Sequence, residues 1–377
     1  MKHSAHIVVG MAYGDEGKGA TVDFLVRKRN AGLVVRFNGG PQALHNVVTP
    51  DIRHHGFSQF GSGTFVPSVR THLSRFMLVN PMNMMEEADH LRILGVLDAL
   101  ERISVDPRAL IITPFQREVN RILAIGHNTC GQGVGQTRSD SLRYGDDGTL
   151  FAGDLLDETV MRRKLKFIQG VSCCAVSGRV TAMLVDSEAI DWCVSRYTAW
   201  ARLGMVNDDL TELLDMTSSV VFEGAQAVLL DETHGDYGFN SWTNTTFDNA
   251  LTLLRDCGYD GTVTKVGVFR SYFTRHGDGP FVESPGDYYW DRPEMHNVTD
   301  KYMGRFRVGQ FDFVAAKRAI EIAKPDWLAI NHLDAFRPTS PVGRPYLVHI
   351  PQPAFLAKIE DELGVPVMIK GYGPSAD

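Results

Sequence analysis

Long hydrophobic runs are missing from this sequence of 377 residues. A transmembrane helix needs roughly 18 consecutive apolar residues, and no stretch approaches that length. The first apolar run, residues 6–9, is also too short for the core of a signal peptide. We therefore expect a cytoplasmic protein with no membrane partner.

Cysteine is scarce, and its spacing is uninformative for metals. The five cysteines are odd in number and none are spaced as C-x-x-C: Cys130, Cys173, Cys174, Cys193 and Cys257. This pattern excludes a disulfide framework and the usual zinc motifs, and it fits a reducing compartment. A strong basic charge is lacking too, because the net charge is −7 and the pI is about 6.0. We expect no nucleic-acid partner.

Linkers, internal repeats and low-complexity tracts are absent, so we expect residues 1–377 to form a single domain. Short β-branched apolar runs predict buried strands, with helical patterns between some of them. The expected strands are 7–9, 33–37, 76–79, 110–112, 220–222, 263–268 and 327–330, and the expected helices are 85–94, 248–257 and 314–323. This alternation predicts an α/β fold with a mainly parallel central sheet flanked by helices.

A glycine-rich segment, Gly14-Asp15-Glu16-Gly17-Lys18-Gly19, follows the first expected strand and precedes an apolar-periodic stretch. In a strand, turn and helix of this kind, backbone N–H groups, the helix dipole and a lysine together bind phosphate. The loop is a variant P-loop, because Gly19 stands where a metal-binding hydroxyl is usual. Asp15 lies inside it. An acid there is tolerable mainly if it binds Mg²⁺ or takes a proton from a substrate.

A second glycine-rich loop, residues 38–46, follows the next expected strand and carries His45. A histidine can act as a general acid, or donate to an oxygen that gains negative charge. A lone loop histidine is usually only solvated. Its combination with the Asp15 loop favours a functional role.

Together the two loops resemble the adenylosuccinate synthetase family, whose signature is W-G-D-E-G-K-G-K followed by R-F-N-G-G-x-N-A-G-H-T. Residues 222–246 are similar to the family's F-E-G-A-Q-G segment, and residues 272–281 to its Y-x-T-R-x-G-x-G-P-F segment. Several long motifs in the same order make a chance match negligible. The similarity extends essentially from end to end and is weakest in the middle.

The resemblance implies a two-step ligation on a 6-oxopurine nucleotide. A base removes the N1 proton, the 6-oxygen attacks the γ-phosphate of a nucleoside triphosphate, and the amine of L-aspartate then displaces the phosphate from C6. By the family pattern, Asp15 is the base and a Mg²⁺ ligand, His45 stabilises or protonates the 6-oxygen, and Lys18 lies on the triphosphate. The backbone carbonyl of Leu44 is the other expected Mg²⁺ ligand.

The resemblance also implies the triphosphate contacts: Gly14, Glu16, Gly17, Lys18, Gly19, Asn331, His332, Asp334, Gly373 and Pro374. Residues 331–334 occupy the place of the family's T-K-L-D. A carboxylate at Asp334 accepts hydrogen bonds from guanine N1 and its 2-amino group but faces the acceptor N1 of adenine unfavourably. GTP is therefore expected rather than ATP, although His332 replaces the family's lysine.

The residues that match purine monophosphate contacts are Asn38, Thr129, Cys130, Gln132, Arg143, Gln226 and Ser241. Cys130 replaces a hydroxyl and Gln132 a cation, so phosphate binding is weakened or rearranged there. Arg143 lies about where the family supplies an arginine across a homodimer interface. The alternative for Arg143 is an ordinary surface residue.

Residues 303–312 resemble a reduced form of the family's aspartate-binding loop, T-G-R-x-R-R-x-G-W-x-D, which implies that Arg305 and Arg307 bind aspartate as a clamp. Two arginines at alternate positions of an extended loop can fork around a dicarboxylate. Thr299, just upstream, is expected to contribute a hydroxyl.

Departures from the ordinary purine-biosynthetic enzyme include Leu44, Gln132 and a shortened arginine loop. In these features the sequence resembles the phage enzymes of 2-aminoadenine synthesis, which are similar to archaeal-type adenylosuccinate synthetases. Those enzymes use dGMP in place of IMP and form N6-succino-2-amino-2′-deoxyadenylate. This sequence also differs from the phage enzymes, because they typically have serine or another small residue in place of Asp15 and lack a counterpart of Asp334.

The prediction is a GTP-dependent ligase acting on dGMP, in the host cytoplasm if a phage encodes it. IMP remains the alternative acceptor. A non-catalytic nucleotide-binding regulator is disfavoured, because it has no reason to retain the arginine pair beside Asp15 and His45.

Overall fold

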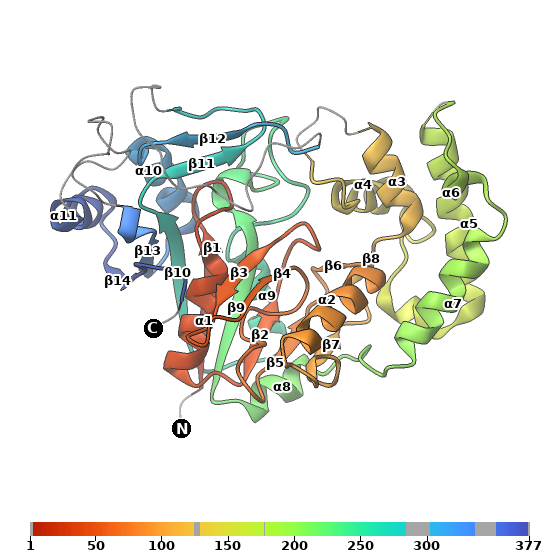
Figure 1. The fold of residues 1–377 in the computed structure, drawn as a ribbon, viewed down its shortest axis with the longest axis horizontal. Helices are drawn as coiled ribbons and strands as arrows, with labels where there is room; N and C mark the ends of the chain where they lie inside the picture. Colours follow the sequence, from red (N-terminus) through yellow and green to blue (C-terminus); the bar gives the residue numbers. More distant parts are fainter. Residues whose placement is uncertain (1–2, 124–128, 177, 284–301, 336–351, 376–377) are drawn as a thin grey trace.

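An eight-stranded parallel sheet forms the centre of the molecule (Figure 1). The computed structural model describes residues 3–123, 129–176, 178–283, 302–335 and 352–375. The strand order is β14-β13-β10-β1-β9-β2-β5-β7. The bounds are β1 Ser4–Gly10, β2 Leu33–Arg36, β5 Arg70–Leu73, β7 Ile103–Val105, β9 Ser219–Ala227, β10 Thr262–Arg270, β13 Trp327–Asn331 and β14 Val367–Lys370. The predicted fold class is confirmed.

In the part of the chain that the structure describes, three two-stranded sheets accompany the central one. β3 (His45–Val48) pairs antiparallel with β4 (His54–Phe57), and β11 (Phe273–His276) pairs antiparallel with β12 (Phe306–Gly309). β6 (Leu78–Val79) and β8 (Leu110–Ile111) are parallel. The β11–β12 ribbon lies beyond one end of the central sheet (Figure 1).

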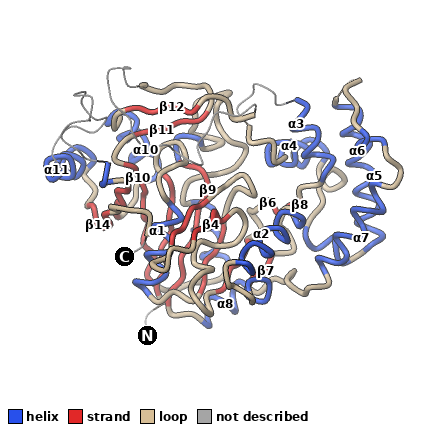
Figure 2. The backbone as a smooth tube through the Cα atoms, viewed as in Figure 1, coloured by secondary structure: helices blue, strands red, loops and turns tan. Residues whose placement is uncertain are grey.

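Helices cover the central sheet and also form a separate group at one side, where α5, α6 and α7 lie (Figure 2). In chain order they are α1 Lys18–Arg29, α2 Pro81–Ile93, α3 Pro114–Leu123, α4 Val134–Tyr144, α5 Glu158–Ala175, α6 Ala182–Val185, α7 Ala189–Ala201, α8 Leu210–Met216, α9 Asp248–Asp256, α10 Phe313–Ala323 and α11 Gln352–Leu363. Within the described ranges, no helix is both long and apolar enough to cross a membrane.

Alternate residues of each central strand serve opposite faces of the sheet, as the period of a strand requires. Val8 and Val34 pack in a cluster with residues of α1. Ile7 and Val9 pack in a larger cluster that includes residues of α8, α9, α10 and α11. Apolar side chains on both faces explain why these strands read as continuous hydrophobic runs.

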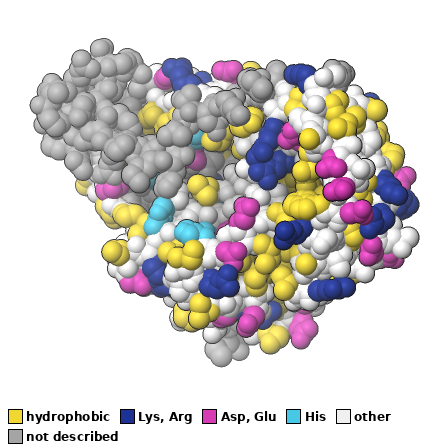
Figure 3. Space-filling model, turned by 45° about the vertical axis from the view of Figure 1, so that its right-hand side comes forward, with side chains coloured by type: hydrophobic (Ala, Val, Ile, Leu, Met, Phe, Trp, Pro, Cys, Tyr) yellow, Lys and Arg dark blue, Asp and Glu magenta, His cyan; other side chains and the backbone are white. Residues whose placement is uncertain are grey.

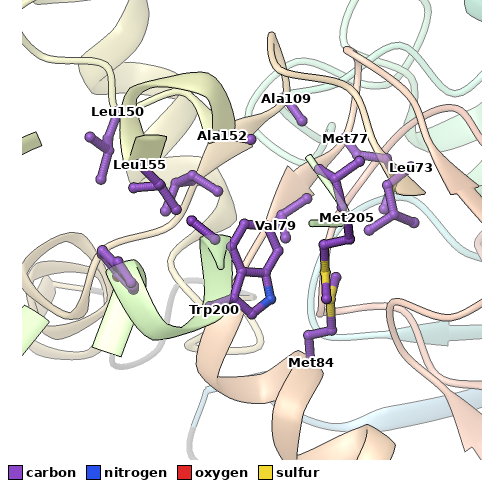
Figure 4. Packing of buried hydrophobic residues seen from close by; sticks show 14 of the residues in the cluster. Leu73, Met77, Val79, Met84, Ala109, Leu150, Ala152, Leu155, Trp200 and Met205 are labelled. Atoms are coloured by element: carbon purple, nitrogen blue, oxygen red, sulfur yellow. The ribbon is translucent and has the colours of Figure 1, made fainter. Parts of the chain in front are cut away.

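A third hydrophobic cluster joins the helical group to α2 and the small β6–β8 sheet. Figure 4 shows the indole of Trp200 among the side chains of Val79, Met84 and Met205. Trp200 is 2% exposed. This cluster fixes α3. A hydrogen bond from Gln116 Nε2 to Asp140 Oδ2 at 3.1 Å joins α4 to α3, and the two helices form one side of the site described below.

All the expected strands and helices are present, but two strands lie outside the central sheet. Residues 78–79 and 110–111 form the small β6–β8 pair, whereas β5, β7 and β14 complete the central sheet. The sequence did not predict β5 because two of its three buried positions, Thr71 and His72, are polar. His72 Nδ1 lies 2.9 Å from Ser104 Oγ on β7, so the hydrogen bond makes these side chains compatible with burial.

The surface carries charges of both signs. In Figure 3, Lys and Arg side chains are interspersed with Asp and Glu over the right-hand side of the view. On α5, Arg163 pairs with Asp147 at 2.6 Å and Lys164 with Asp146 at 2.9 Å. The five cysteines are free thiols.

Candidate active site

A cavity of about 990 Å³ opens where the central strands end. Its lining comes from the loops after β1, β2, β9, β10 and β13, together with α4 and its preceding loop. Ligands of parallel α/β sheets bind at the carboxyl ends of the strands. The volume suits a nucleotide-sized ligand.

The first loop has the backbone of a phosphate-binding turn. Gly14 and Gly17 adopt φ values of 118° and 86°, which glycine tolerates, and α1 begins directly at Lys18. Glu16 is buried and accepts hydrogen bonds from the N–H groups of Ala12 and Gly14 at 3.0 and 2.8 Å. The loop is thus shaped from within by a carboxylate, and the N-terminus of α1 reaches the cavity.

Lys18 is buried and already engaged by the loop. Its Nζ donates to the carbonyl of Gly14 at 2.6 Å and to Glu16 Oε2 at 2.9 Å. Lys18 also lines the cavity. An entering phosphate would therefore meet a lysine held in position by a neutralising carboxylate.

Asn331, at the end of β13, ties the far side of the cavity to this loop. Its Nδ2 donates to the carbonyls of Glu16 and Gly17 at 2.8 and 3.1 Å, and to Thr21 Oγ1 at 3.0 Å. A Cβ at Gly17 would lie only 2.8 Å from Asn331 Nδ2. Glycine is needed there for both the turn and the close approach.

Asp15 lines the cavity, with its Oδ2 3.4 Å from His276 Nε2. Burial alone raises the pKa of Asp15, but the contact with His276 and the charges of Arg270 and Lys18 outweigh it. The pKa is held below its ordinary value. Asp15 is therefore an ionised carboxylate in the ligand-free protein.

His45 forms a buried pair with Glu223 from β9. His45 Nδ1 lies 2.5 Å from Glu223 Oε1, and Ser62 donates to the same carboxylate through Oγ and through its N–H at 2.9 Å. Burial lowers the pKa of His45 to about 4 against the attraction of Glu223. Burial alone raises the pKa of Glu223, but His45 and Arg36 lower it to about 2. We infer a neutral imidazole that donates through Nδ1 to an ionised carboxylate.

The wall expected to bind the triphosphate base is assembled from two segments. Asn331, His332, Asp334, Gly373 and Pro374 all line the cavity. The N–H of Leu333 donates to the carbonyl of Gly371 at 2.9 Å, which brings the C-terminal segment against this wall. The structure thus places side by side two stretches that the sequence separates by about forty residues.

The monophosphate residues divide into two groups. Thr129, Cys130, Gln226 and Ser241 line the cavity, whereas Asn38, Gln132 and Arg143 are outside its lining. Asn38 holds loops together, because Nδ2 donates to the carbonyls of Ala225 and Asn244 at 3.1 and 2.8 Å. Gln132 Oε1 accepts from Asn83 Nδ2 at 3.3 Å. Arg143 is exposed on α4, with its guanidinium over the ring of Tyr144.

The two clamp arginines lie on the β12 side of the ribbon and do not line this cavity. Arg305 is exposed and pairs with Glu283 at 2.8 Å. Arg307 is buried and donates to the carbonyl of Gly279 at 3.0 Å, while its Nε and Nη2 have no hydrogen-bond partner in the described part of the chain. Thr299 lies outside the described residues.

Arg275 connects the clamp side to the cavity. It stands opposite Arg307 in the β11–β12 register and lines the cavity itself. Burial lowers the pKa of Arg307, and the nearby Arg275 lowers it further. Two adjacent, partly desolvated guanidinium groups form a site that favours an anion.

The model of a family described as adenylosuccinate synthetase matches residues 7–343. The chain belongs to the adenylosuccinate synthetase family. It is 32% identical over 345 residues to the adenylosuccinate synthetase of Streptococcus gordonii, covering 87% of this chain and 76% of that protein. It is 30% identical over 348 residues to that of Clostridium beijerinckii, covering 88% and 78%. As a member of this family, the protein is a carbon–nitrogen ligase.

Two solved structures share the fold. Fully ligated adenylosuccinate synthetase from Plasmodium falciparum has a TM-score of 0.78 at 19% identity and covers 98% of both chains. Cyanophage S-2L succinoaminodeoxyadenylate synthetase, bound to dGMP and dATP as an energy donor, has a TM-score of 0.67 at 18% identity. That match covers 100% of this chain and 94% of the other.

Adenylosuccinate synthetases are GTP-dependent and use Mg²⁺, and the donor set here fits such an ion. No group of three His, Cys, Asp or Glu side chains converges as a metal cluster within the described ranges. Mg²⁺ usually binds one or two carboxylates and takes its other ligands from phosphates and water. Asp15 supplies a carboxylate in the cavity and Leu44 lines the same space.

Sequence reasoning assigned no role to four residues at this site: Glu223, Arg270, Arg275 and His276. Each lies within or at the carboxyl end of a strand, and three of them fall inside stretches that resemble the adenylosuccinate synthetase family. For Arg270 and His276, position at the end of a strand was the available signal. The contacts of Glu223 with His45 and of His276 with Asp15 join distant segments, so no local pattern reveals them.

Proposed function

We propose that this enzyme joins L-aspartate to C6 of dGMP with GTP as phosphoryl donor, forming N6-succino-2-amino-2′-deoxyadenylate, GDP and phosphate. The observation that carries the choice of dGMP is a buried acceptor in the cavity. Gln226, at the end of β9, has an Oε1 atom that is buried and has no hydrogen-bond partner in the described structure.

A purine with an amino group at C2 would satisfy that acceptor. Gln226 lines the cavity, and its backbone is held at φ 59° where β9 ends. The 2-amino group of dGMP is a donor, whereas IMP presents only a C–H bond at that position. A buried polar group left unpaired costs about 1–3 kcal/mol, so the amide favours the aminated purine.

The proposed chemistry uses groups that already surround the cavity. Asp15 takes the N1 proton, and the electron pair moves through the ring to the 6-oxygen, which bonds to the γ-phosphorus as the bond from that phosphorus to the departing GDP oxygen breaks. His45 Nε2, after taking a proton from solvent, donates to that oxygen, and Glu223 stabilises the imidazolium through Nδ1. Lys18 exchanges its contacts within the loop for triphosphate oxygens.

Asp15 and the carbonyl of Leu44 would hold Mg²⁺, which neutralises charge on the phosphates. The amine of aspartate then displaces phosphate from C6. Arg305 and Arg307 are proposed to bind its carboxylates. The two unpartnered buried nitrogens of Arg307 support this role, because guanidinium binds carboxylate in a bidentate manner.

Asp334 supports GTP as the donor, since its carboxylate lines the wall formed with Gly373 and Pro374. A carboxylate there pairs with guanine N1 and its 2-amino group. The cyanophage neighbour is described with dATP as an energy donor, so dATP is a necessary comparison.

IMP is the second candidate acceptor. The bacterial relatives at 32% and 30% identity are named adenylosuccinate synthetases, and they match most of this chain. Under this alternative Gln226 would contact another edge of the purine.

The test is aspartate-dependent phosphate release with dGMP, GMP or IMP, each combined with GTP, ATP or dATP. We expect the highest kcat/KM with dGMP and GTP. Turnover with IMP and none with dGMP would overturn the proposal.

Two variants at Gln226 sharpen this assay. Gln226→Met removes the acceptor and should raise the KM for dGMP about tenfold more than the KM for IMP, as expected for roughly 1.4 kcal/mol. Gln226→Glu keeps an acceptor at the same reach and should preserve the preference. If Gln226→Met changed the KM for dGMP and the KM for IMP equally, Gln226 would not contact the 2-amino group.

We also propose a homodimer in which Arg143 acts in the partner's cavity, because Arg143 is exposed and lies outside the cavity lining of its own chain. Mixing inactive Arg143→Leu and Asp15→Asn proteins should restore activity in hybrid dimers. A mixture as inactive as its components argues for the surface alternative.

A further inference from the structure

Asp15 contacts His276, a residue with no role in the chemistry proposed above. Its Oδ2 lies 3.4 Å from Nε2 of His276, and both residues line the nucleotide cavity. Asp15 comes from the loop after β1, whereas His276 is the last residue of β11. The contact therefore joins the phosphate loop to the β11–β12 ribbon.

The position of His276 is fixed by its strand pairing and by a ring contact. It stands opposite Phe306 in the antiparallel register, and the two ring centroids are 4.9 Å apart. The N–H of Gly277 donates to the carbonyl of Arg305 at 2.9 Å, which fixes the backbone directly after the histidine. Packing against Phe306 and the backbone ladder therefore support the imidazole.

The cations near Asp15 have other hydrogen-bond partners. Lys18 is engaged by Gly14 and Glu16, and Arg270 donates to Tyr272 and, at 3.3 Å, to Thr274 Oγ1. They act on Asp15 through their charge. A charge at a distance does not fix the rotation of a carboxylate about its Cβ–Cγ bond, whereas a directional hydrogen bond does.

Orientation matters because a carboxylate can take the N1 proton only along one of its lone pairs. Small misplacements of a reacting group can lower a rate about a hundredfold. Catalytic hydrogen bonds are often long before substrate binds and tighten in the complex, so 3.4 Å is compatible with a donor role.

We propose that His276 is a positioning residue whose Nε2–H donates to one lone pair of Asp15 Oδ2, leaves the second lone pair of that oxygen for Mg²⁺, and turns the other carboxylate oxygen toward the N1 proton of the purine. The N1–H bond breaks, the proton passes to that oxygen, and the electron pair moves to the ring and its 6-oxygen. This inference rests on the proposed ligase function, in which Asp15 is the base. His276 itself does not touch the reacting atoms.

The first comparison is between two substitutions of the donor. His276→Leu removes the hydrogen bond and should lower kcat about 10–100-fold, with the KM for aspartate and for GTP within about twofold of wild type. His276→Gln places an amide N–H at a similar reach and should restore kcat to within about fivefold of wild type. A role limited to packing on Phe306 predicts no such rescue.

The second measurement isolates the step that Asp15 performs. In GTP labelled with ¹⁸O at the β–γ bridge, reversible phosphoryl transfer to the nucleotide scrambles the label without aspartate. We expect His276→Leu to slow this exchange by the same factor as kcat, and His276→Gln to restore it. His90, exposed on α2 and outside the cavity lining, provides the matched control, and His90→Leu should change neither rate.

Thermal melting and dGMP binding are measured for each variant. If His276→Leu does not fold, His276→Asn takes its place, because its amide is too short to reach Asp15. Equal losses in the Leu and Gln variants with unchanged melting would overturn the positioning role. So would a raised KM for aspartate at unchanged kcat.

The outcomes separate this inference from the function on which it rests. An active wild-type enzyme whose kcat survives His276→Leu refutes the positioning role alone. A wild-type enzyme that turns over no purine nucleotide refutes both.

Discussion

His45 and Glu223 form a buried pair in which the imidazole Nδ1 lies 2.5 Å from the carboxylate Oε1. The pair joins the first residue of β3 to β9, and Ser62 donates to the same carboxylate. The carboxylate fixes which imidazole nitrogen carries the proton, and it can stabilise positive charge on the ring when a substrate oxygen becomes negative.

Glu223→Gln should therefore slow catalysis without unfolding the protein. The amide cannot balance an imidazolium, so we expect kcat to fall about 100-fold, the size typical of losing one transition-state donor. Steady-state phosphate release measures it. Ser62→Ala, which removes one hydrogen bond but keeps the charge, should cost less than tenfold. A Glu223→Gln enzyme within twofold of wild type would contradict the role of Glu223.

Lys18 and Glu16 should affect the free energy of unfolding jointly, whereas GTP binding should depend on Lys18 alone. Lys18→Met leaves the buried Glu16 carboxylate unpaired, and breaking such a pair costs about 3–5 kcal/mol of unfolding free energy. Lys18→Met combined with Glu16→Gln should recover most of that stability. The KM for GTP should stay high in both proteins, because the cation is gone.

Denaturant titration of the two proteins measures the free energy of unfolding, and steady-state kinetics measures the KM for GTP. Recovery of GTP binding in the double variant would show that Lys18 acts on the fold rather than on the triphosphate.

Asn331 should stabilise the phosphate loop through the donors on Nδ2. Asn331→Asp places an acceptor against the carbonyls of Glu16 and Gly17, so we expect a loss of about 1–3 kcal/mol in unfolding free energy and a higher KM for GTP. Asn331→Ala removes the donor without the repulsion and should cost less. Amide hydrogen exchange in residues 14–19 should accelerate in both variants. Unchanged exchange would place the constraint elsewhere.

His6 should make the fold sensitive to acid. Burial and, to a smaller extent, Arg29 lower the pKa of this imidazole from 6.5 to about 4. Between those pH values the unfolded chain binds a proton that the folded chain does not, so the free energy of unfolding falls as the pH falls. The contribution of His6 amounts to about 3 kcal/mol when the pH has reached about 4.

Replacing His6 by Phe isolates this effect. Between pH 6.5 and 4 the variant should lose less unfolding free energy than wild type, because it lacks the contribution of His6. Some loss should remain, because His45 titrates in both proteins. Urea titrations at several pH values provide the measurement. Parallel pH profiles would show that His6 is not the group responsible.

Local sequence was sufficient for the phosphate loop. Gly14 and Gly17 stand where the backbone needs positive φ, and the apolar residues after them continue as α1, so strand, turn and helix could all be predicted. By contrast, β5 carries buried Thr71 and His72, whose polarity is acceptable only because partners in β7 and neighbouring loops accept or donate hydrogen bonds. Such a strand has no hydrophobic signature.

For the site, the amino-acid sequence was enough to give the residue types and their order: a carboxylate and a lysine in a glycine turn, a histidine loop, an arginine pair and then Asp334. Those features predicted phosphate binding and, through resemblance, the family. The tertiary structure alone decided which groups meet. It turns Lys18 toward Glu16, pairs His45 with Glu223 and brings His276 to Asp15. The reason is physical: a helix or turn is set by neighbours along the chain, whereas a side chain's charge and orientation are set by whatever the parallel sheet brings to its carboxyl edge.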